Sequence, residues 1–312
     1  MFRPPSSRFD LVPQHGELRP PAGLPRRTVL AAAALLLGGC GPAHGPNHDG
    51  PDAPEAAALP RRPRVAWVLG SGGPRGFVHV GVVKALWELG LMPDLIVGAS
   101  AGAFVGTLRA AGLPSAELER LALDMQPWEL VRWNPADPTR LSGQGLAQFV
   151  NRQVDHRHLQ ALPTPMVCAV QRLRDGEVVG LSRGDAGVAV QASSAIEGRF
   201  TPVVIRGELY ADADLRMPLP VRLARELGAV RVLAVDASAH EDRAPPGAEE
   251  HREFDIRKRA LTEPDVAAAD LVLHPDLGYW SGMTRDYRQR VIGIGYREAL
   301  AQEQALRALH AP

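Results

Sequence analysis

The segment Gly98-Ala99-Ser100-Ala101-Gly102 has a residue pattern suited to nucleophilic chemistry. It follows the apolar run 95–97 and precedes the small-residue segment 101–111, so the pattern predicts a buried strand, a sharp turn and a helix. Glycines two positions before and after a serine allow a tight turn that exposes the hydroxyl, and the helix directs its N-terminus at developing negative charge. Ser100 is therefore a candidate acyl-transfer nucleophile on an elbow formed by Gly98 and Gly102. A glycine-rich connection with an incidental serine is the alternative.

A second glycine-rich loop lies upstream, at Gly70-Ser71-Gly72-Gly73-Pro74-Arg75-Gly76, between the strand-like run 65–69 and a helical pattern. A dinucleotide-binding fingerprint starting at Gly70 requires glycine where Arg75 stands, and no P-loop lysine follows, which argues against a nucleotide-binding module. Successive N–H groups at Gly72 and Gly73 at a helix N-terminus suit an oxyanion better. Because Pro74 has no N–H, a third donor has to come from Arg75 or beyond.

Two acids end a third strand-like segment, Glu208-Leu-Tyr-Ala-Asp212-Ala213-Asp214. A carboxylate at a strand end can orient or deprotonate a nucleophile that the fold brings near it. The alternative is an aspartate that only caps a turn.

In this order the glycine loop, the Gly-x-Ser-x-Gly motif and the strand-end Asp212 resemble the bacterial patatin-like phospholipases, over residues 64–312. The most specific stretch is LGSGGPRGFVHVGVVKAL, residues 69–86. The resemblance implies a three-layer α/β/α fold with a mostly parallel central sheet. It also implies hydrolysis of acyl esters of the phospholipase A, lysophospholipase or esterase type, without a catalytic histidine, cofactor or metal. By matched position, Ser100 is the nucleophile, Asp212 is the base, and the oxyanion hole is lined by Gly72, Gly73 and Arg75.

The chain departs from the family pattern at three places. Ser71 stands where many members have glycine, Pro74 occupies a variable site, and Asp-Gly-Gly or Asp-Gly-Ala appears as Asp212-Ala213-Asp214. If position 213 requires a positive φ, alanine there costs on the order of 1 kcal/mol and tilts Asp212, which leaves Asp214 as the fallback base. The altered turn also leaves open a lipid-binding or regulatory protein with little turnover.

The charge balance argues against nucleic acid as a binding partner, and one histidine near the glycine loop requires separate comment. The 35 basic and 35 acidic residues balance, so no electrostatic case exists for nucleic acid, and the expected partner is an acyl-ester lipid. His79 lies one helical turn after the glycine loop, where a buried core histidine is favoured over a catalytic one. The oligomeric state stays open.

The N-terminal sequence Arg26-Arg27-Thr-Val-Leu, continuing to Leu37-Gly38-Gly39-Cys40, resembles a bacterial lipoprotein signal, of either the twin-arginine or the general secretory type. Its apolar run is too short for a membrane span, which needs ~20 residues. We therefore expect a signal peptide over residues 1–40 with a lipidated Cys40, a flexible tether over 41–63 that is poor in large apolar residues, and a hydrolase domain over 64–312.

This signal predicts a protein anchored to a membrane of the cell envelope and facing the periplasm. In a diderm host, Gly41 in place of aspartate favours the outer membrane. A cytoplasmic protein is the alternative if the N-terminal segment is only an extension from a misassigned start codon.

Overall fold

The computed structural model describes residues 45–135, 137 and 139–311. The predicted signal peptide and Cys40 lie outside the described residues. Within the described part, no helix combines the length and the apolar character needed to cross a membrane.

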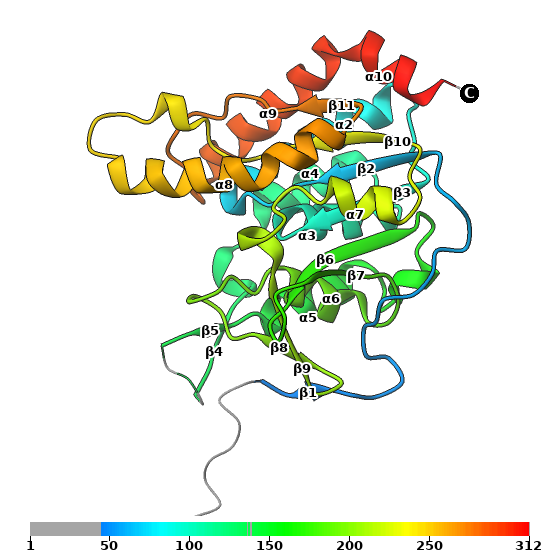
Figure 1. Ribbon diagram of the computed structural model, residues 1–312, viewed down its shortest axis with the longest axis vertical. Helices are drawn as coiled ribbons and strands as arrows, with labels where there is room; N and C mark the ends of the chain where they lie inside the picture. The colour runs from blue at the N-terminus through cyan, green and yellow to red at the C-terminus, as the bar shows by residue number, and fades with distance from the viewer. Residues whose placement is uncertain (1–44, 136, 138, 312) are drawn as a thin grey trace, which may run out of the picture. The chain divides into compact units, whose positions relative to one another are not determined.

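A nine-stranded sheet forms the centre of the domain, in the order β1-β8-β9-β6-β3-β2-β10-β11, with β7 paired to β6. Figure 1 shows β11 near the C-terminus at one end of this sheet and β1, β8 and β9 at the other. The bounds of its strands are β1 (Asn47–His48), β2 (Val65–Leu69), β3 (Leu95–Ala99), β6 (Met166–Arg172), β7 (Val178–Leu181), β8 (Val203–Ile205), β9 (Glu208–Asp212), β10 (Arg231–Val235) and β11 (Leu271–Leu273). A separate hairpin joins β4 (Arg132–Trp133) to β5 (Leu141–Ser142).

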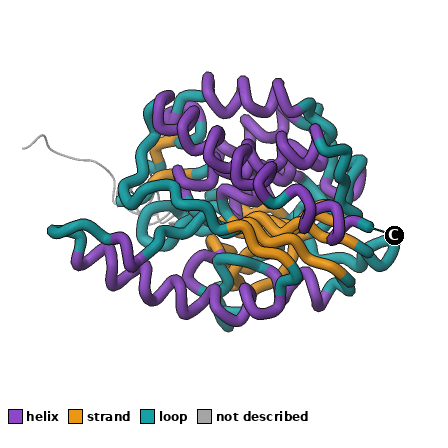
Figure 2. Tube along the Cα trace, turned by 90° about the horizontal axis from the view of Figure 1, so that it is seen from above, coloured by secondary structure: helices purple, strands orange, loops and turns teal. Residues whose placement is uncertain are grey.

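Helices cover both faces of the sheet, as the view in Figure 2 shows. The described α-helices are α2 (Val78–Glu88), α3 (Ala101–Ala110), α4 (Ser115–Asp124), α5 (Gln144–Gln153), α6 (Ala186–Ser193), α7 (Val221–Glu226), α8 (Glu249–Ala268), α9 (Arg285–Ala301) and α10 (Glu303–His310). Short 3₁₀ helices lie at η1 (Gly73–Phe77), η2 (Pro127–Glu129), η3 (Leu159–Ala161), η4 (Ala213–Leu215) and η5 (Glu241–Arg243).

Alternation along β2 explains the layers. Its residues Val65, Trp67 and Leu69 belong to the larger core, together with residues of α2, α3, α6 and α9. Ala66 and Val68 belong to a smaller core on the opposite face, with residues of α7. Successive side chains of a strand point to opposite faces, so a strand that is apolar throughout is buried between two helical layers. The three-layer prediction is confirmed.

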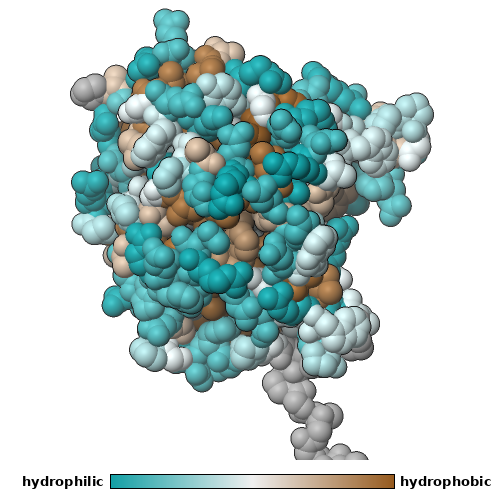
Figure 3. Space-filling model, turned by 180° about the vertical axis from the view of Figure 1, so that it is seen from behind, coloured by the Kyte–Doolittle hydropathy of each residue, from teal (hydrophilic) through white to brown (hydrophobic). Residues whose placement is uncertain are grey.

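The outer surface is mixed. On the face seen from behind in Figure 3, hydrophobic residues form small groups among hydrophilic ones, as is usual for a folded domain.

Strand directions differ across the sheet. The strands β11, β10, β2, β3 and β6 are parallel neighbours, as the βα alternation predicts. By contrast, β7 and β9 both run antiparallel to β6, and β8 runs antiparallel to β9. The sheet is thus mixed, and the elbow strand β3 lies within its parallel part, between β2 and β6.

Strand β6 brings two predicted site residues together. The elbow strand β3 pairs with its first half, where Ala99 lies opposite Ala169. The acid-bearing strand β9 pairs with its second half, where Asp212 lies opposite Val170. Since β3 and β9 run in opposite directions, their carboxyl ends meet along β6. Ser100 and Asp212 therefore come from segments that end at consecutive positions of β6.

The prediction of a flexible tether over residues 41–63 is wrong from residue 45 onward. β1 pairs in parallel with β8, and Arg206 N donates to His48 O (2.9 Å). Further along, Glu55 forms a bridge with Arg183, and Ala53 is buried. Composition missed this because the segment is held mainly by backbone hydrogen bonds, which do not require large apolar side chains.

Candidate active site

Ser100 lies at the turn between β3 and α3 with φ 54° and ψ −119°, in the left-handed half of φ space that β-carbon-bearing residues rarely adopt. The two flanking glycines make this turn possible. A Cβ on Gly102 would lie 1.9 Å from Leu69 O, and one on Gly98 would lie 2.5 Å from Gly102 O. The predicted strand–turn–helix elbow is present, and α3 begins directly after the serine.

Ser193 of α6 supports the elbow from beneath. Its hydroxyl accepts a hydrogen bond from Ser100 N (3.0 Å) and donates one to Ala169 O (2.7 Å). Ser193 is fully buried, so this bridge ties the strained backbone of the elbow to strand β6 in a site without competing water.

The glycine loop is anchored at its start and open in its middle. Gly70 N donates to Val235 O (3.0 Å), and Ser71 N donates to Pro218 O (2.8 Å). No backbone acceptor among the described residues takes the N–H of Gly72 or Gly73, and Gly73 lines the same pocket as Ser100. Both N–H groups are therefore available to an oxyanion. Arg75 is a poorer donor than predicted, because its N–H already donates to Gly72 O (3.0 Å).

Asp212 is a buried carboxyl, 2% exposed, at the end of β9. Its Oδ1 accepts a hydrogen bond from Asp214 N (3.0 Å), while Oδ2 has no hydrogen-bond partner among the described residues. Burial, helped by the negative charge of Asp214, raises the pKa of Asp212 to about 7, although the Ser100 hydroxyl and the Asp214 N–H oppose this change. Asp212 is thus poised to exchange a proton near neutral pH.

Asp214 lies in a different environment, although it is only two residues away. Lys258 of α8, itself buried, contacts Asp214 Oδ1 at 2.6 Å and donates to Ser71 Oγ at 3.1 Å, and Ser71 Oγ donates to the same carboxylate. The positive charge of Lys258 holds the pKa of Asp214 below its usual value despite burial. Asp214 is therefore committed to an ion pair, which makes it unsuitable as the fallback base.

The alanine at position 213 is not strained. Among the described residues, positive φ occurs outside glycine only at Ser100, Asp155, His156 and Arg206. Ala213 begins the short helix η4 and is fully buried. The condition under which it would tilt Asp212 is therefore not met.

His79 is fully buried, and its Nε2 lies 2.8 Å from Gly70 O. Burial lowers its pKa to about 4, so it is neutral and donates from Nε2 to this carbonyl. It anchors the first residue of the glycine loop, as the prediction of a core histidine implies.

An apolar pocket of about 270 Å³ opens over Ser100. Not one of the side chains that line it carries a formal charge. The lining includes Phe77, Phe104, Leu130, Leu146, Ile196, Phe200 and Met283. The segment 126–133 contributes Pro127, Leu130 and Val131 to this wall, while Trp128 and Trp133 remain about two-thirds exposed. A pocket of this kind suits a hydrocarbon chain.

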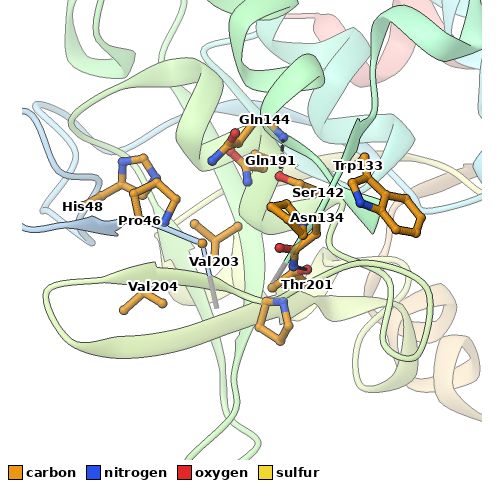
Figure 4. A pocket seen from close by; sticks show the side chains of 13 residues that line it. Pro46, His48, Trp133, Asn134, Ser142, Gln144, Gln191, Thr201, Val203 and Val204 are labelled. Carbon is orange, nitrogen blue, oxygen red and sulfur yellow. Dashed lines mark hydrogen bonds between the residues drawn. The ribbon is translucent and has the colours of Figure 1, made fainter. Parts of the chain in front are cut away.

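A second hollow of about 340 Å³ adjoins the first through the shared residue Gln191. Figure 4 shows Pro46 and His48 on one side of this hollow and Trp133 on the other. Neither Ser100 nor Asp212 lines it, so it contains none of the reacting groups identified above.

Three residues of this site were not assigned by sequence reasoning: Ser193, Lys258 and Ser71. Ser193 lies 93 residues from Ser100, and Lys258 lies 187 residues from Ser71. The sequence carried a usable signal at Ser71 and Asp214, since both replace small residues of the family pattern. The structure shows that these two residues contact each other. Within the described chain, no cluster of three or more His, Cys, Asp or Glu side chains could hold a metal ion.

Comparison with known proteins places this geometry in a family context. The model of the patatin family, described as patatin-like phospholipase, matches residues 67–225. An uncharacterized NTE family protein of Mycobacterium tuberculosis is 34% identical over 197 residues, which make up 60% of this chain and 54% of the relative. A lysophospholipase of Coccidioides immitis is 29% identical over 197 residues, 59% of this chain and 12% of its own.

This chain therefore spans about half the length of the mycobacterial relative and a small part of the fungal one. Among solved structures, VipD from Legionella pneumophila is similar with a TM-score of 0.43 and 15% identity, covering 83% of this chain and 70% of that one.

Proposed function

The chain belongs to the patatin-like phospholipase family, and on that premise we propose that it hydrolyses the acyl ester bonds of lipids with Ser100 as nucleophile and Asp212 as base. The observation that carries this proposal is the convergence of the Ser100 elbow, the unpartnered Oδ2 of Asp212 and an uncharged apolar pocket. This combination supports acyl transfer from a substrate with a hydrocarbon chain.

In the proposed reaction, the acyl chain lies in the apolar pocket and the ester carbonyl lies over Ser100. Asp212 takes the proton of the Ser100 hydroxyl as its oxygen attacks the carbonyl carbon. The N–H groups of Gly72 and Gly73, with the N-terminus of α3, stabilise the tetrahedral oxyanion. Asp212 returns the proton to the departing alcohol. Water then attacks the acyl-enzyme and gives a proton to Asp212, which passes it to the Ser100 oxygen as the fatty acid leaves.

Labelling with a fluorophosphonate tests this proposal, because the reagent modifies only an activated serine. We expect stoichiometric labelling of the full chain at Ser100 and no labelling of Ser100→Ala. We also expect Ser100→Ala to remain folded and to lose hydrolysis of a panel of p-nitrophenyl esters and phospholipids. A protein that binds lipid but is neither labelled nor active would support the regulatory alternative.

A separate N-terminal pattern, the resemblance of residues 26–40 to a bacterial lipoprotein signal, leads us to propose a lipid-anchored location through Cys40. This residue lies outside the described part of the chain, so the proposal rests on Leu37-Gly38-Gly39-Cys40 and the residues before it. A lipoprotein cysteine carries more than one acyl chain, and burial at ~0.8 kcal/mol per CH₂ makes two chains a stable anchor where one is marginal. Because β1 begins at Asn47, six residues would separate such an anchor from the first strand.

Cell fractionation tests the location. Wild-type protein is expected in the envelope membranes with residues 1–39 removed, and Cys40→Ser is expected to block both lipid attachment and cleavage. Wild-type protein recovered from the cytoplasm with Met1 in place would contradict the lipoprotein assignment and favour a cytoplasmic hydrolase.

A further inference from the structure

A charged and aromatic hollow of about 600 Å³ lies on the far side of the glycine loop from the acyl pocket. Two segments separate the two cavities. In the glycine loop, Gly73, Pro74 and Gly76 line the acyl pocket, whereas Arg75 lines this hollow. In the second segment, Phe200 lines the acyl pocket and Arg199 lines the hollow. The two cavities therefore share these segments as a common wall, with an apolar lining on one side and a charged lining on the other.

The hollow is lined by side chains of both charge signs. Arg75 and Arg199 supply the cations, and Glu250 and Asp255 supply the carboxylates. Among the described residues no ion pair joins any of these four side chains. Arg75 donates from Nη2 to Tyr279 O, while its buried Nε has no hydrogen-bond partner. An unpaired guanidinium group is the preferred protein ligand for phosphate.

Aromatic rings form the other wall. Trp280 meets Tyr279 and His251 edge to face, each with ring centroids 5.4 Å apart, and Phe254 also lines the cavity. Tyr279 donates its hydroxyl hydrogen to Asp255 Oδ2 (2.8 Å), which sets a carboxylate beside the rings. Trp280 is 55% exposed, so part of its ring is open to a ligand. Aromatic faces next to a carboxylate favour an organic ammonium ion.

We propose that this hollow, which we name the Arg75–Trp280 hollow, binds the headgroup of a zwitterionic phospholipid whose acyl ester is at Ser100. The phosphate would lie toward Arg75 and Arg199, and the ammonium group would lie toward Trp280 and the carboxylates. This inference rests on the proposed function for the position of the ester, and it adds a second recognition site to the acyl pocket. It also makes lipids without a headgroup poorer ligands.

The test uses the full chain with Ser100→Ala, so that binding is measured without turnover. Lysophosphatidylcholine, lysophosphatidic acid and monoacylglycerol with the same acyl chain are titrated below their micelle concentrations by calorimetry. We expect the choline lipid to bind roughly tenfold more tightly than monoacylglycerol, with the phosphate-only lipid between them.

Two further substitutions in the same background separate the parts of the headgroup. Arg199→Ala should reduce the preference for both phosphate lipids over monoacylglycerol. Trp280→Ala should reduce only the preference for the choline lipid over the phosphate-only lipid. Arg307→Ala, an exposed arginine on α10, is the matched control and should leave both preferences unchanged. Thermal unfolding checks that each variant is folded.

Equal affinity for the three lipids, or preferences that ignore Arg199 and Trp280, would overturn the proposal. Tightest binding of lysophosphatidic acid, unaffected by Trp280→Ala, would overturn the zwitterionic assignment. The proposed hydrolysis is judged separately, from turnover of p-nitrophenyl esters by the wild-type chain. Activity without lipid discrimination would thus reject the hollow alone, and discrimination without activity would reject the hydrolase alone.

Discussion

The two sides of the turn that follows β9 hold similar carboxylates in opposite states. On one side, Asp212 is buried beside the elbow, keeps one oxygen free of hydrogen bonds and has its pKa raised to about 7. On the other side, Asp214 is paired with Lys258 and Ser71, and its pKa is lowered. The difference teaches that burial alone does not make a base. An acid becomes a proton acceptor near neutral pH when it is buried without a cation of its own.

The largest effect is expected from removing the base. Asp212→Asn should lower kcat/KM for ester hydrolysis on the order of 10³-fold, because the amide cannot take the proton of Ser100. Asp214→Asn should be clearly milder, since Asp214 acts through its ion pair. Steady-state kinetics on one p-nitrophenyl ester measure both changes.

Asp286→Asn, on the exposed first turn of α9, is the matched control and should be as active as wild type. If Asp214→Asn proved the more damaging of the two, the base would be Asp214 and the contrast between the two sides would be reversed.

The free energy of unfolding should change in opposite directions when Asp214 and Asp212 are each replaced by asparagine. Asp214→Asn leaves the buried Lys258 without its counter-charge and should lower the free energy of unfolding by about 3 kcal/mol. The pKa of Asp212 is higher in the folded than in the unfolded state, so its contribution to stability is greatest below about pH 4 and is lost as pH rises through about 7. Asp212→Asn should therefore stabilise the protein at pH 8, by about 1 to 2 kcal/mol.

Urea unfolding at pH 8 and at pH 5 measures this prediction. The stabilising effect of Asp212→Asn should shrink at the lower pH, where the wild-type carboxyl is largely protonated. A loss of stability at pH 8 in both variants would show that Asp212 is not held in an unfavourable charged state.

The dependence of kcat/KM on pH should also distinguish the roles of Asp212 and Asp214. Asp212 works as a base only when ionised, so wild-type kcat/KM should rise with pH, with a midpoint near 7, and then level off. Asp214→Asn removes a neighbouring negative charge and should move this midpoint to lower pH. Fatty-acid release from an uncharged ester over pH 5–9 measures both midpoints. An unchanged midpoint in Asp214→Asn would show that the two carboxylates are not electrostatically coupled.

The smallest effect is expected at the residue between the two acids. Ala213 has no positive φ, so Ala213→Gly relieves no strain and should change activity less than about twofold. The added chain flexibility should lower stability by roughly 1 kcal/mol. A marked gain in activity would mean that alanine does tilt Asp212.

Much of the local structure could be predicted from the sequence because its signals are local. The runs 65–69 and 95–97, each followed by glycines and a helical pattern, predicted β2, β3 and the helices after them. The same applies to the elbow at Ser100, where the need for glycine on either side is set by neighbouring backbone.

The arrangement of the site depended on distant contacts that no local pattern encodes. The direction of β9 relative to β6 is set by strand pairing, and it decides that Asp212 meets Ser100. Lys258 is one of several charged residues on α8, and the sequence does not distinguish it from the others. Its burial against Asp214 is visible only in the structure. Arg75 was predicted to line the oxyanion hole only because of its position in the motif. In the structure its N–H donates a hydrogen bond to Gly72 O instead.

The pairing of β1 with β8 has a consequence for the solubility of shortened forms of the protein. A fragment that begins at residue 61 lacks β1. In such a fragment β8 becomes the outermost strand at its end of the sheet. An uncovered strand edge presents free N–H and C=O groups, which are a template for edge-to-edge pairing with another molecule. Removal of Asn47 and His48 is therefore expected to promote aggregation, and a soluble fragment should begin before them.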